Sequence, residues 1–375
     1  MALKIEKLVT GAYGLGHEGK QTYMVKDALP GEEVTLGRQQ KKGSVILSRA
    51  ESVSNPSPMR VEPICPLYGK CGGCDFLCVS RRDSAYLKEE MIRDNLRRIS
   101  GLEEEVEFLP PAYTEERAYR SRVRFHVRLS DKSIGFLERE SNNLIPIEYC
   151  PLLTDRINAL LKEKNLLLKK ARSMMFENRV NRNTGFIELA VQDGDEEVSI
   201  GGNTIDCLGY KVNSNVFFQS DLILLPELLD FVKENTVGEV VMDLYSGVGT
   251  FSRLFEGSGK TLYAVEREKR CLELSKRNAP SAKSFTDDVA VFSKKVRYPM
   301  DTVIVDPPRV GLASSVVEMM MKWNPERIIY VSCDSTTFCR DFKLMKDRYR
   351  ISKARVFDFY PGSSHEESAF VLDRT

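Results

Sequence analysis

The sequence predicts an α/β protein in which a small β-rich unit and a central mixed region precede a parallel sheet wound with helices. From residue 211 onward, apolar runs that suit buried strands (EVVMDL, TLYAV, DTVIVD, RIIYVS) alternate with helical patterns such as REKRCLELSKRNA. Residues 1–54 instead contain short strand-like runs separated by turns with glycine or proline. That pattern is typical of a small β-barrel.

The composition narrows the class of protein. A chain of 375 residues has room for two or three domains, and 42% hydrophobic with 29% charged residues excludes a mainly disordered or collagen-like protein. We find no apolar run long enough to span a bilayer, and the start MALKIEKLVTGAYG does not resemble a signal peptide, so we expect a cytoplasmic protein. With a net charge of +1, any nucleic acid would have to be bound by local basic patches.

Two changes of character divide the chain. The stretch NPSPMRVEPICP contains four prolines and is expected to be an extended linker. The region that follows it holds clustered cysteines, a helical stretch near 83–99 and β-rich segments. The expected domains are therefore 1–54, 55–210 and 211–375.

The run GLGHEGK resembles two nucleotide-binding loops, because it matches GxGxxG and nearly matches the phosphate-binding loop. Both motifs need a strand before the loop and a helix after it. The segment that follows here, QTYMVKDALPG, is β-like. We therefore expect the glycines to form hairpin turns.

The cysteines favour metal binding or catalysis over disulfide bonds, since a cytosolic protein rarely contains disulfides. Three of the nine lie within ten residues: Cys65, Cys71 and Cys74. Zinc or a 4Fe-4S cluster needs a fourth ligand. Cys150 is the best candidate because it also begins a Cys-Pro step, whereas the apolar neighbours of Cys78 suit a buried thiol. Spacing alone leaves zinc and iron–sulfur open.

A cofactor site is predicted at VMDLYSGVGTF, which reads as a strand, a glycine-rich turn and a helix. Ser252 occupies the place of the third glycine of the dinucleotide fingerprint, which argues against NAD. Glu266 ends the next strand, where its carboxylate can bind both ribose hydroxyls. This combination favours S-adenosylmethionine.

Two further strands deliver reactive side chains to the carboxyl edge of the sheet, where ligands bind in open α/β folds. DTVIVDPPRVGL brings Asp306 there, and RIIYVSCDSTTFCRD brings Cys333, which is positioned like a nucleophile. Cys339 suits a core thiol. Glu366 and Glu367 follow in a turn before a final strand, and such a pair of acids is usually solvated.

Together these segments resemble the RNA uracil-C5 methyltransferase family, whose bacterial members make 5-methyluridine in ribosomal or transfer RNA. The resemblance covers nearly the whole chain. It implies a TRAM-like, OB-like RNA-binding barrel, a central α+β domain with a 4Fe-4S cluster, and a Rossmann-like S-adenosylmethionine-dependent methyltransferase domain. The segment CPLYGKCGGC with the later cysteine resembles the cluster ligands, which implies the set Cys65, Cys71, Cys74 and Cys150.

The resemblance also implies the roles of individual residues. VSCDSTTFCRD resembles the nucleophile segment, which implies Cys333, and SSHEES resembles a terminal His-x-Glu-Ser motif that aligns Glu367, not Glu366, with the general base. Thr250 and the segment PGSSHEES depart from the usual family residues, which concerns the substrate more than the reaction. The implied cofactor-binding residues are Gln219, Tyr245, Gly247, Gly249, Glu266, Asp288 and Asp306.

The implied reaction moves a methyl group from S-adenosylmethionine to C5 of a specific uridine, in ribosomal more than in transfer RNA, through a covalent bond between Cys333 and C6. Thiolate addition makes C5 nucleophilic, and a base then removes the C5 proton. We expect a monomer that binds RNA and does not bind a membrane. The candidate RNA contacts in RAYRSRVRFHVR are Arg117, Arg120, Arg122 and Arg124. A solvated strand face would have the same composition.

Other functions remain open. A transfer-RNA uridine-C5 methyltransferase would share these motifs. A cytosine-C5 methyltransferase usually takes its thiol from a Pro-Cys step after the DPP strand, where this chain has Arg309. A non-catalytic RNA-binding protein would not need Cys333 and Glu367 together.

Overall fold

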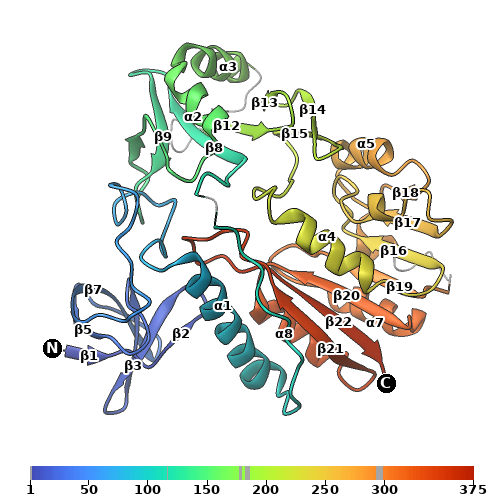
Figure 1. Ribbon diagram of the computed structural model, residues 1–375, viewed down its shortest axis with the longest axis horizontal. Helices are drawn as coiled ribbons and strands as arrows, with labels where there is room; N and C mark the ends of the chain where they lie inside the picture. Colours follow the sequence, from blue (N-terminus) through green and yellow to red (C-terminus); the bar gives the residue numbers. More distant parts are fainter. Residues whose placement is uncertain (1, 116, 177–179, 182–185, 293–298) are drawn as a thin grey trace.

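The computed structural model describes residues 2–115, 117–176, 180–181, 186–292 and 299–375. Figure 1 shows an N-terminal sheet at the lower left, a central sheet with helices at the top, and a larger C-terminal sheet at the right. The alternation of strands and helices expected from the sequence is present in the C-terminal part. In the described part of the chain, no helix has the length and apolar character needed to cross a membrane.

The N-terminal unit is a seven-stranded sheet with the order β1-β5-β7-β4-β3-β2, and β6 pairs with β7. Its strands are β1 (Ala2–Lys4), β2 (Lys7–Val9), β3 (Tyr13–Glu18), β4 (Gln21–Lys26), β5 (Glu33–Leu36), β6 (Gln40–Lys42) and β7 (Val45–Asn55). The run GLGHEGK forms the β3–β4 hairpin, and Gly19 in its turn has a φ of +58°, which a glycine adopts without strain. The hairpin expectation is confirmed, and closure into a barrel stays a prediction.

The segment that holds Cys65, Cys71 and Cys74 is called the cysteine loop. After it, the central region has one helix and then a second sheet. Its elements are α1 (Arg81–Asn95), the π-helical turn η1 (Leu96–Ser100), β8 (Arg122–Arg128), β9 (Ser133–Leu137), β10 (Leu144–Pro146), α2 (Asp155–Lys162), α3 (Lys164–Phe176), β11 (Val180–Asn181), β12 (Phe186–Asp193) and β13 (Val198–Ile200). The sheet order is β10-β9-β8-β12-β11, with β13 paired to β12. Helices α2 and α3 pack on its apolar face, where Phe125 and Leu189 meet Ile157 and Leu168.

The C-terminal sheet has seven strands in the order β18-β17-β16-β19-β20-β22-β21. Before it come the hairpin β14 (Thr204–Cys207) and β15 (Tyr210–Asn213) and the helix α4 (Leu225–Glu234). The rest are β16 (Val240–Leu244), η2 (Ser252–Phe255), β17 (Thr261–Val265), α5 (Lys269–Asn278), β18 (Lys283–Phe285), α6 (Val289–Phe292), β19 (Thr302–Val305), α7 (Ser314–Trp323), β20 (Arg327–Ser332), α8 (Ser335–Lys343), β21 (Tyr349–Val356) and β22 (Ser368–Arg374).

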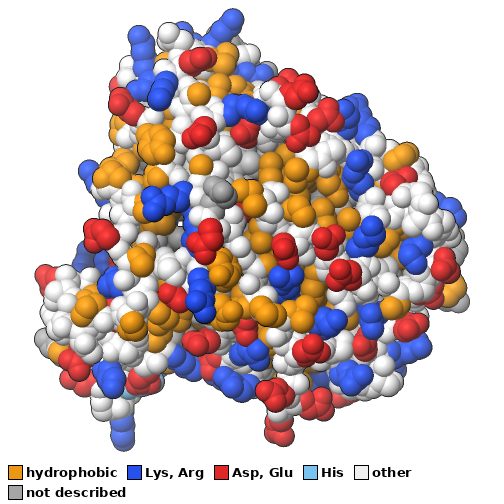
Figure 2. Space-filling model, in the orientation of Figure 1, with side chains coloured by type: hydrophobic (Ala, Val, Ile, Leu, Met, Phe, Trp, Pro, Cys, Tyr) orange, Lys and Arg blue, Asp and Glu red, His pale blue; other side chains and the backbone are white. Residues whose placement is uncertain are grey.

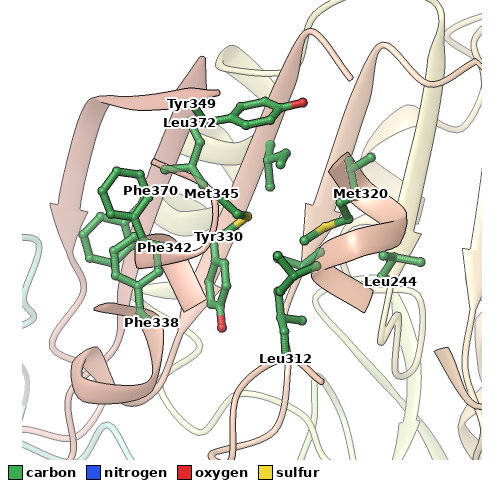
Figure 3. Close-up of a cluster of buried hydrophobic side chains, with 14 of the residues drawn as sticks. Leu244, Leu312, Met320, Tyr330, Phe338, Phe342, Met345, Tyr349, Phe370 and Leu372 are labelled. Atoms are coloured by element: carbon green, nitrogen blue, oxygen red, sulfur yellow. The ribbon is translucent and has the colours of Figure 1, made fainter. Parts of the chain in front are cut away.

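This sheet is mixed rather than fully parallel. Strands β18, β17, β16, β19 and β20 are parallel neighbours, whereas β22 is antiparallel to both β20 and β21. Helices α1, α7 and α8 cover one face, and α4, α5 and the β14–β15 hairpin cover the other. Figure 3 shows the first of these cores, in which Phe338 of α8 stacks on Phe370 of β22 at 3.7 Å between ring centroids.

Two segments assigned by sequence to the central domain pack on the C-terminal sheet instead. Ile92 and Leu96, from α1 and η1, belong to the core under α8, and residues 108 and 112 form parallel bridges with residues 354 and 357. The expected boundary at 210/211 falls inside the β14–β15 hairpin, whose buried side chains join the core of α4. Hydrophobic spacing identifies a buried face but not the sheet that covers it.

A fully buried ion pair joins α1 to the loop that precedes β22. Lys88 Nζ lies 2.6 Å from Asp358 Oδ1 and 3.2 Å from the carbonyl oxygen of Tyr360. Ser84 Oγ donates to the other Asp358 oxygen at 2.8 Å. Because both charged groups are completely buried, each depends on the other to offset the loss of its hydration.

Breaking this pair should strongly destabilise the protein. Lys88→Met leaves the Asp358 carboxylate buried without its cation, which we expect to cost about 3–5 kcal/mol of folding free energy. Chemical denaturation followed by circular dichroism measures the change. Lys7→Met is the matched control, because the Lys7–Asp94 pair is partly exposed and should contribute about 1 kcal/mol or less. Equal losses in the two variants would contradict the role given to Lys88.

Candidate active site

A cleft of about 670 Å³ opens at the carboxyl ends of the parallel strands. Open α/β sheets bind their ligands at this edge. The cleft brings together most of the candidate residues, although their positions span more than a hundred residues of sequence. Its lining includes Gln219, Tyr245, Gly247, Glu266, Asp306, Cys333 and Glu367.

The glycine-rich turn after β16 forms one wall. Tyr245 and Gly247 have left-handed backbones, with φ of 63° and 54°. Glu266, at the end of β17, accepts hydrogen bonds from the Gly247 amide at 3.0 Å and the Glu268 amide at 2.7 Å. The carboxylate of Glu266 therefore fixes the turn while lining the cleft.

Ser252 has a structural reason for standing where a third glycine was considered. Its amide and hydroxyl donate to Asp243 Oδ2 at 3.0 and 2.6 Å. Asp243 is buried beneath the turn, and burial raises its pKa to about 7. Gly249 does not line the cleft: its φ is +82°, and a Cβ there would lie 2.8 Å from Ser275 Oγ. It shapes the turn instead.

Two buried polar atoms of the cleft await a partner. In the described part of the chain, neither Gln219 Oε1 nor Ser246 Oγ has a hydrogen-bond partner. Both residues line the cleft. Buried polar atoms normally form hydrogen bonds, so these two fit a polar ligand such as the amino-acid and ribose groups of S-adenosylmethionine.

The nucleophile candidate and the base candidate face each other across two strands. In the antiparallel pair β20–β22, Ser332 lies opposite Ser368. Continuing this register by one residue places Cys333 opposite Glu367, just beyond the last paired residues of the two strands. The side chains of both residues line the cleft, together with Asp306 from the end of β19.

Burial and mutual repulsion favour the neutral forms of these three groups. Burial, followed by the charge of Asp243, raises the pKa of Asp306 to about 7. Burial and then Asp306 raise the pKa of Glu367 well above its ordinary value, while nearby Arg309 lowers it. Burial, Glu367 and Asp306 raise the pKa of the Cys333 thiol to about 12. A positive charge entering this corner would lower all three pKa values.

The expectation of a solvated acidic turn is wrong. Glu366 and Glu367 are each only 4% exposed. Glu366 Oε1 accepts from the amide and the hydroxyl of Ser335 at 2.8 and 2.6 Å, at the start of α8. Glu366 therefore fastens the helix that follows Cys333.

Asp288 lies outside the cleft. It directly precedes α6, where its Oδ1 accepts from the Ala290 amide at 2.9 Å, and its other oxygen lies 3.8 Å from Arg267. Arg267 lines the cleft, and the charge of Asp288, after burial, raises the pKa of Tyr245, so Asp288 lies beside the cleft and its cofactor role stays a prediction.

Four cysteines line a second, smaller pocket: Cys65, Cys71, Cys74 and Cys150. Cys78 does not line it and is buried in a separate core, as expected. Burial raises the pKa of Cys74 to about 12. Within the described residues, no three His, Cys, Asp or Glu side chains stand close enough to hold a metal ion. The thiols are thus gathered in one pocket without forming a coordination shell.

The arginine-rich segment has divided roles. Arg120 lines both the cleft and the cysteine pocket. Arg122 donates to the carbonyl oxygen of Ser214 at 2.9 Å, and Arg124 pairs with Glu188 at 2.8 Å. Arg117 is exposed. On the face in Figure 2, acidic and basic side chains are intermixed, so this face carries no broad basic surface.

Sequence reasoning missed several residues of the cleft, among them Phe217, Arg309, Tyr360 and His365. Phe217 is 59% exposed, a large value for an aromatic side chain in a cleft, and it lies two residues before Gln219. Arg309 Nη2 lies 3.0 Å from Nδ1 of His365. Arg309 and His365 each lie within a motif already named, and that position was the sequence feature that could have identified them as cleft residues.

The comparisons with known proteins find similarity to RNA methyltransferases. Residues 293–375 match the family model described as tRNA (uracil-5-)-methyltransferase. An RNA methyltransferase of Thermotoga maritima is 28% identical over 99% of this chain and 98% of the relative. The 23S rRNA (uracil(1939)-C(5))-methyltransferase RlmD of Pseudomonas savastanoi is 27% identical over 99% of this chain and 93% of that protein.

The solved structure of the Pyrococcus abyssi tRNA (uracil-54, C5)-methyltransferase in complex with S-adenosyl-L-homocysteine has the same fold. It is 24% identical, covers 99% of this chain and 100% of its own, and superposes with a TM-score of 0.74. The matches to RNA uracil-C5 methyltransferases thus extend over the β-rich, central and C-terminal parts alike. The chain is therefore similar over nearly its whole length to RNA uracil-C5 methyltransferases, and its C-terminal residues match the model of that family.

Proposed function

We propose that this protein is an S-adenosylmethionine-dependent RNA methyltransferase that methylates C5 of a uridine in 23S ribosomal RNA. The observation that carries the proposal is the meeting of Cys333, Glu367 and Asp306 in one cleft beside the Gln219 and Glu266 side chains. The ribosomal target is supported by similarity to RlmD proteins over nearly the full chain. Transfer RNA is the alternative, because the P. abyssi enzyme of the same fold acts on it.

The chemistry follows from the facing pair. Cys333, as a thiolate, adds to C6 of uracil, and the electron density released makes C5 nucleophilic. When bound, S-adenosylmethionine would supply the methyl group from its sulfonium to C5, its S–CH3 bond breaking as the C5–CH3 bond forms. Glu367 then accepts the C5 proton, the C5–C6 double bond re-forms, and the Cys333 thiolate leaves.

The electrostatics of the cleft suit that sequence. Without a bound cation, Asp306 and Glu367 repel each other and burial favours their protonated forms. A cationic sulfonium bound in this cleft would stabilise their anionic forms, so Glu367 would be available as a base when the donor is bound. Arg309 acts in the same direction on Glu367.

The second pocket supports a 4Fe-4S cluster as a structural group. Its donor set is four thiols from two segments, which is the chemistry such a cluster requires. Arg120 in the same pocket would offset the negative charge of thiolate ligands. We assign the cluster to Cys65, Cys71, Cys74 and Cys150.

RNA binding is assigned to the N-terminal sheet, as a TRAM-like module, and to the arginine-rich segment. Arg120 is the best placed of the four arginines to reach a nucleotide in the cleft. The target uridine has to be flipped out of its stack to enter a site of this depth. The exposed ring of Phe217 offers a stacking surface at the cleft.

A deletion strain tests the substrate. Its 23S ribosomal RNA should lack one 5-methyluridine, because no thiol–carboxylate pair remains to make it, and mass spectrometry of nuclease fragments locates the site. The wild-type gene should restore the modification, and a Cys333→Ala gene should not. Loss of the nucleoside from transfer RNA alone would move the assignment to the alternative substrate.

Trapping of the covalent intermediate tests the division of labour in the cleft. Cys333→Ala should form no adduct and transfer no methyl group. Glu367→Gln should form an adduct that persists, since its amide cannot accept the C5 proton; a denaturing gel with labelled RNA detects it. Glu366→Gln is the matched control and should turn over nearly normally, because an amide oxygen can still accept both Ser335 bonds.

The same experiment has a pH signature. Elimination requires Glu367 to be deprotonated, and its pKa is raised, so the elimination rate should increase with pH beyond the usual range of a glutamate.

Persistent adduct in Glu366→Gln but not in Glu367→Gln would shift the base by one residue. Methyl transfer by Cys333→Ala would refute the covalent route.

Metal analysis tests the cysteine pocket. Protein purified without oxygen should be brown and contain about four iron atoms per chain. Cys74→Ala should lose both colour and iron, whereas Cys78→Ala should keep them, because Cys78 lies outside the pocket. A colourless protein with one zinc ion would contradict the iron–sulfur assignment.

A further inference from the structure

The end of the cysteine loop is bonded directly to the loop that carries the base. Asp75 Oδ1 accepts from the Ser364 amide at 2.6 Å, and Asp75 Oδ2 accepts from the Ser364 hydroxyl at 2.9 Å. The amides of Asp75 and Phe76 donate to the carbonyl oxygen of Gly362 at 3.1 and 2.9 Å. Four hydrogen bonds thus join segments separated by 289 positions in the sequence.

The contact is close as well as polar. Gly362 has a φ of +82°, and a Cβ built on it would lie 2.8 Å from a methyl carbon of Leu77. The base loop therefore approaches the segment 75–77 as closely as a glycine permits. Nζ of Lys26, in the N-terminal sheet, lies 3.4 Å from Asp75 Oδ2 and forms an ion pair with the carboxylate.

The attachment adds to two other restraints on Glu367: its carbonyl oxygen accepts from the Phe357 amide at 2.9 Å, and the next residue, Ser368, begins β22. Among the described residues, none donates a hydrogen bond to the Glu367 carboxylate, so its place is set by the backbone of its own loop. Ser364 lies only three residues before it. On the nucleophile side, Cys333 directly follows β20, and the bonds from Ser335 to Glu366 tie the start of α8 to the loop of Glu367.

We propose that Asp75 is a positioning residue that holds the loop of Glu367 in the geometry for proton removal. The proposal rests on the proposed function, in which Glu367 is the base. Asp75 does not line the cleft itself; it acts through Ser364 and Gly362. Loss of its carboxylate should impair elimination of the covalent adduct and leave the attack of Cys333 intact.

The test separates these two steps by comparing RNA that contains uridine with RNA that contains 5-fluorouridine. Transcripts of 23S ribosomal RNA and of transfer RNA are made with either uridine or 5-fluorouridine. Fluorine at C5 cannot be removed as a cation, so a fluorouridine adduct stalls after methyl transfer whether or not a base is in place. Its formation reports on Cys333, and the decay of the uridine adduct reports on Glu367.

Asp75→Ala should form the fluorouridine adduct at nearly the wild-type rate, while its uridine adduct decays about tenfold more slowly or more, since small misplacements of catalytic groups cost factors of this size. Asp75→Asn, whose amide oxygen can still accept from the Ser364 amide, should recover part of the rate. Ser364→Ala keeps that amide bond and should fall between wild type and Asp75→Ala. Asp94→Ala, which removes an ion pair of α1 with the N-terminal sheet, is the matched control and should resemble wild type.

Each result has one meaning. Equal slowing of adduct formation and decay in Asp75→Ala, or no slowing of decay in any Asp75 or Ser364 variant, overturns the proposal. If Asp75→Ala does not fold, Asp75→Asn and Ser364→Ala decide by the same two rates. If the wild-type protein forms no fluorouridine adduct with either RNA, the proposed function itself fails, independently of Asp75.

Discussion

The structure depends on the buried pair of Lys88 and Asp358. Two opposite charges without water are stable only when they are held in contact, so this pair fixes α1 against the segment that follows β21. That segment leads directly to the residues opposite the strand of Cys333. In Figure 1 the red loop before β22 lies at the centre of the molecule, beside the upper end of α1.

Around this contact, the N-terminal half acts as a frame for the C-terminal site. Tyr119 donates to the carbonyl oxygen of Pro361 at 3.2 Å, and the cysteine loop bonds the next residues of the same loop. The C-terminal sheet alone has the strands and helices to bind a nucleoside cofactor. The loop bearing the carboxylates, however, is held in large part by residues from the first third of the chain. This arrangement gives a physical reason for the N-terminal and central parts besides contact with RNA.

The sequence predicted the parts of the site that are encoded locally. Asp306 and Cys333 each follow an apolar strand, and parallel strands must end at a common edge, so their convergence could be predicted from the order of elements alone. The turn from Tyr245 to Gly247 was predictable for the same reason. The grouping of Cys150 with the earlier cysteines matches the expectation as a pocket, whereas its metal stays a proposal.

What the sequence could not predict are contacts between distant positions. Two adjacent glutamates suggest a solvated turn until Ser335, thirty-one positions away, is seen to cap one of them. The partner of Lys88 lies 270 positions further along the chain. The place of Asp288 beside the cleft also depends on where α6 begins, and helix starts are poorly defined by spacing alone.

The antiparallel placement of β22 has a consequence for how the protein is made. This strand sits between β20 and β21, so until residues 368–374 have emerged from the ribosome both neighbours present unpaired edges. Exposed edges of this kind invite pairing with other chains. Cys333 also meets its facing carboxylate only when β22 docks. Completion of the sheet and the approach of the Cys333 and Glu367 side chains are therefore a single event.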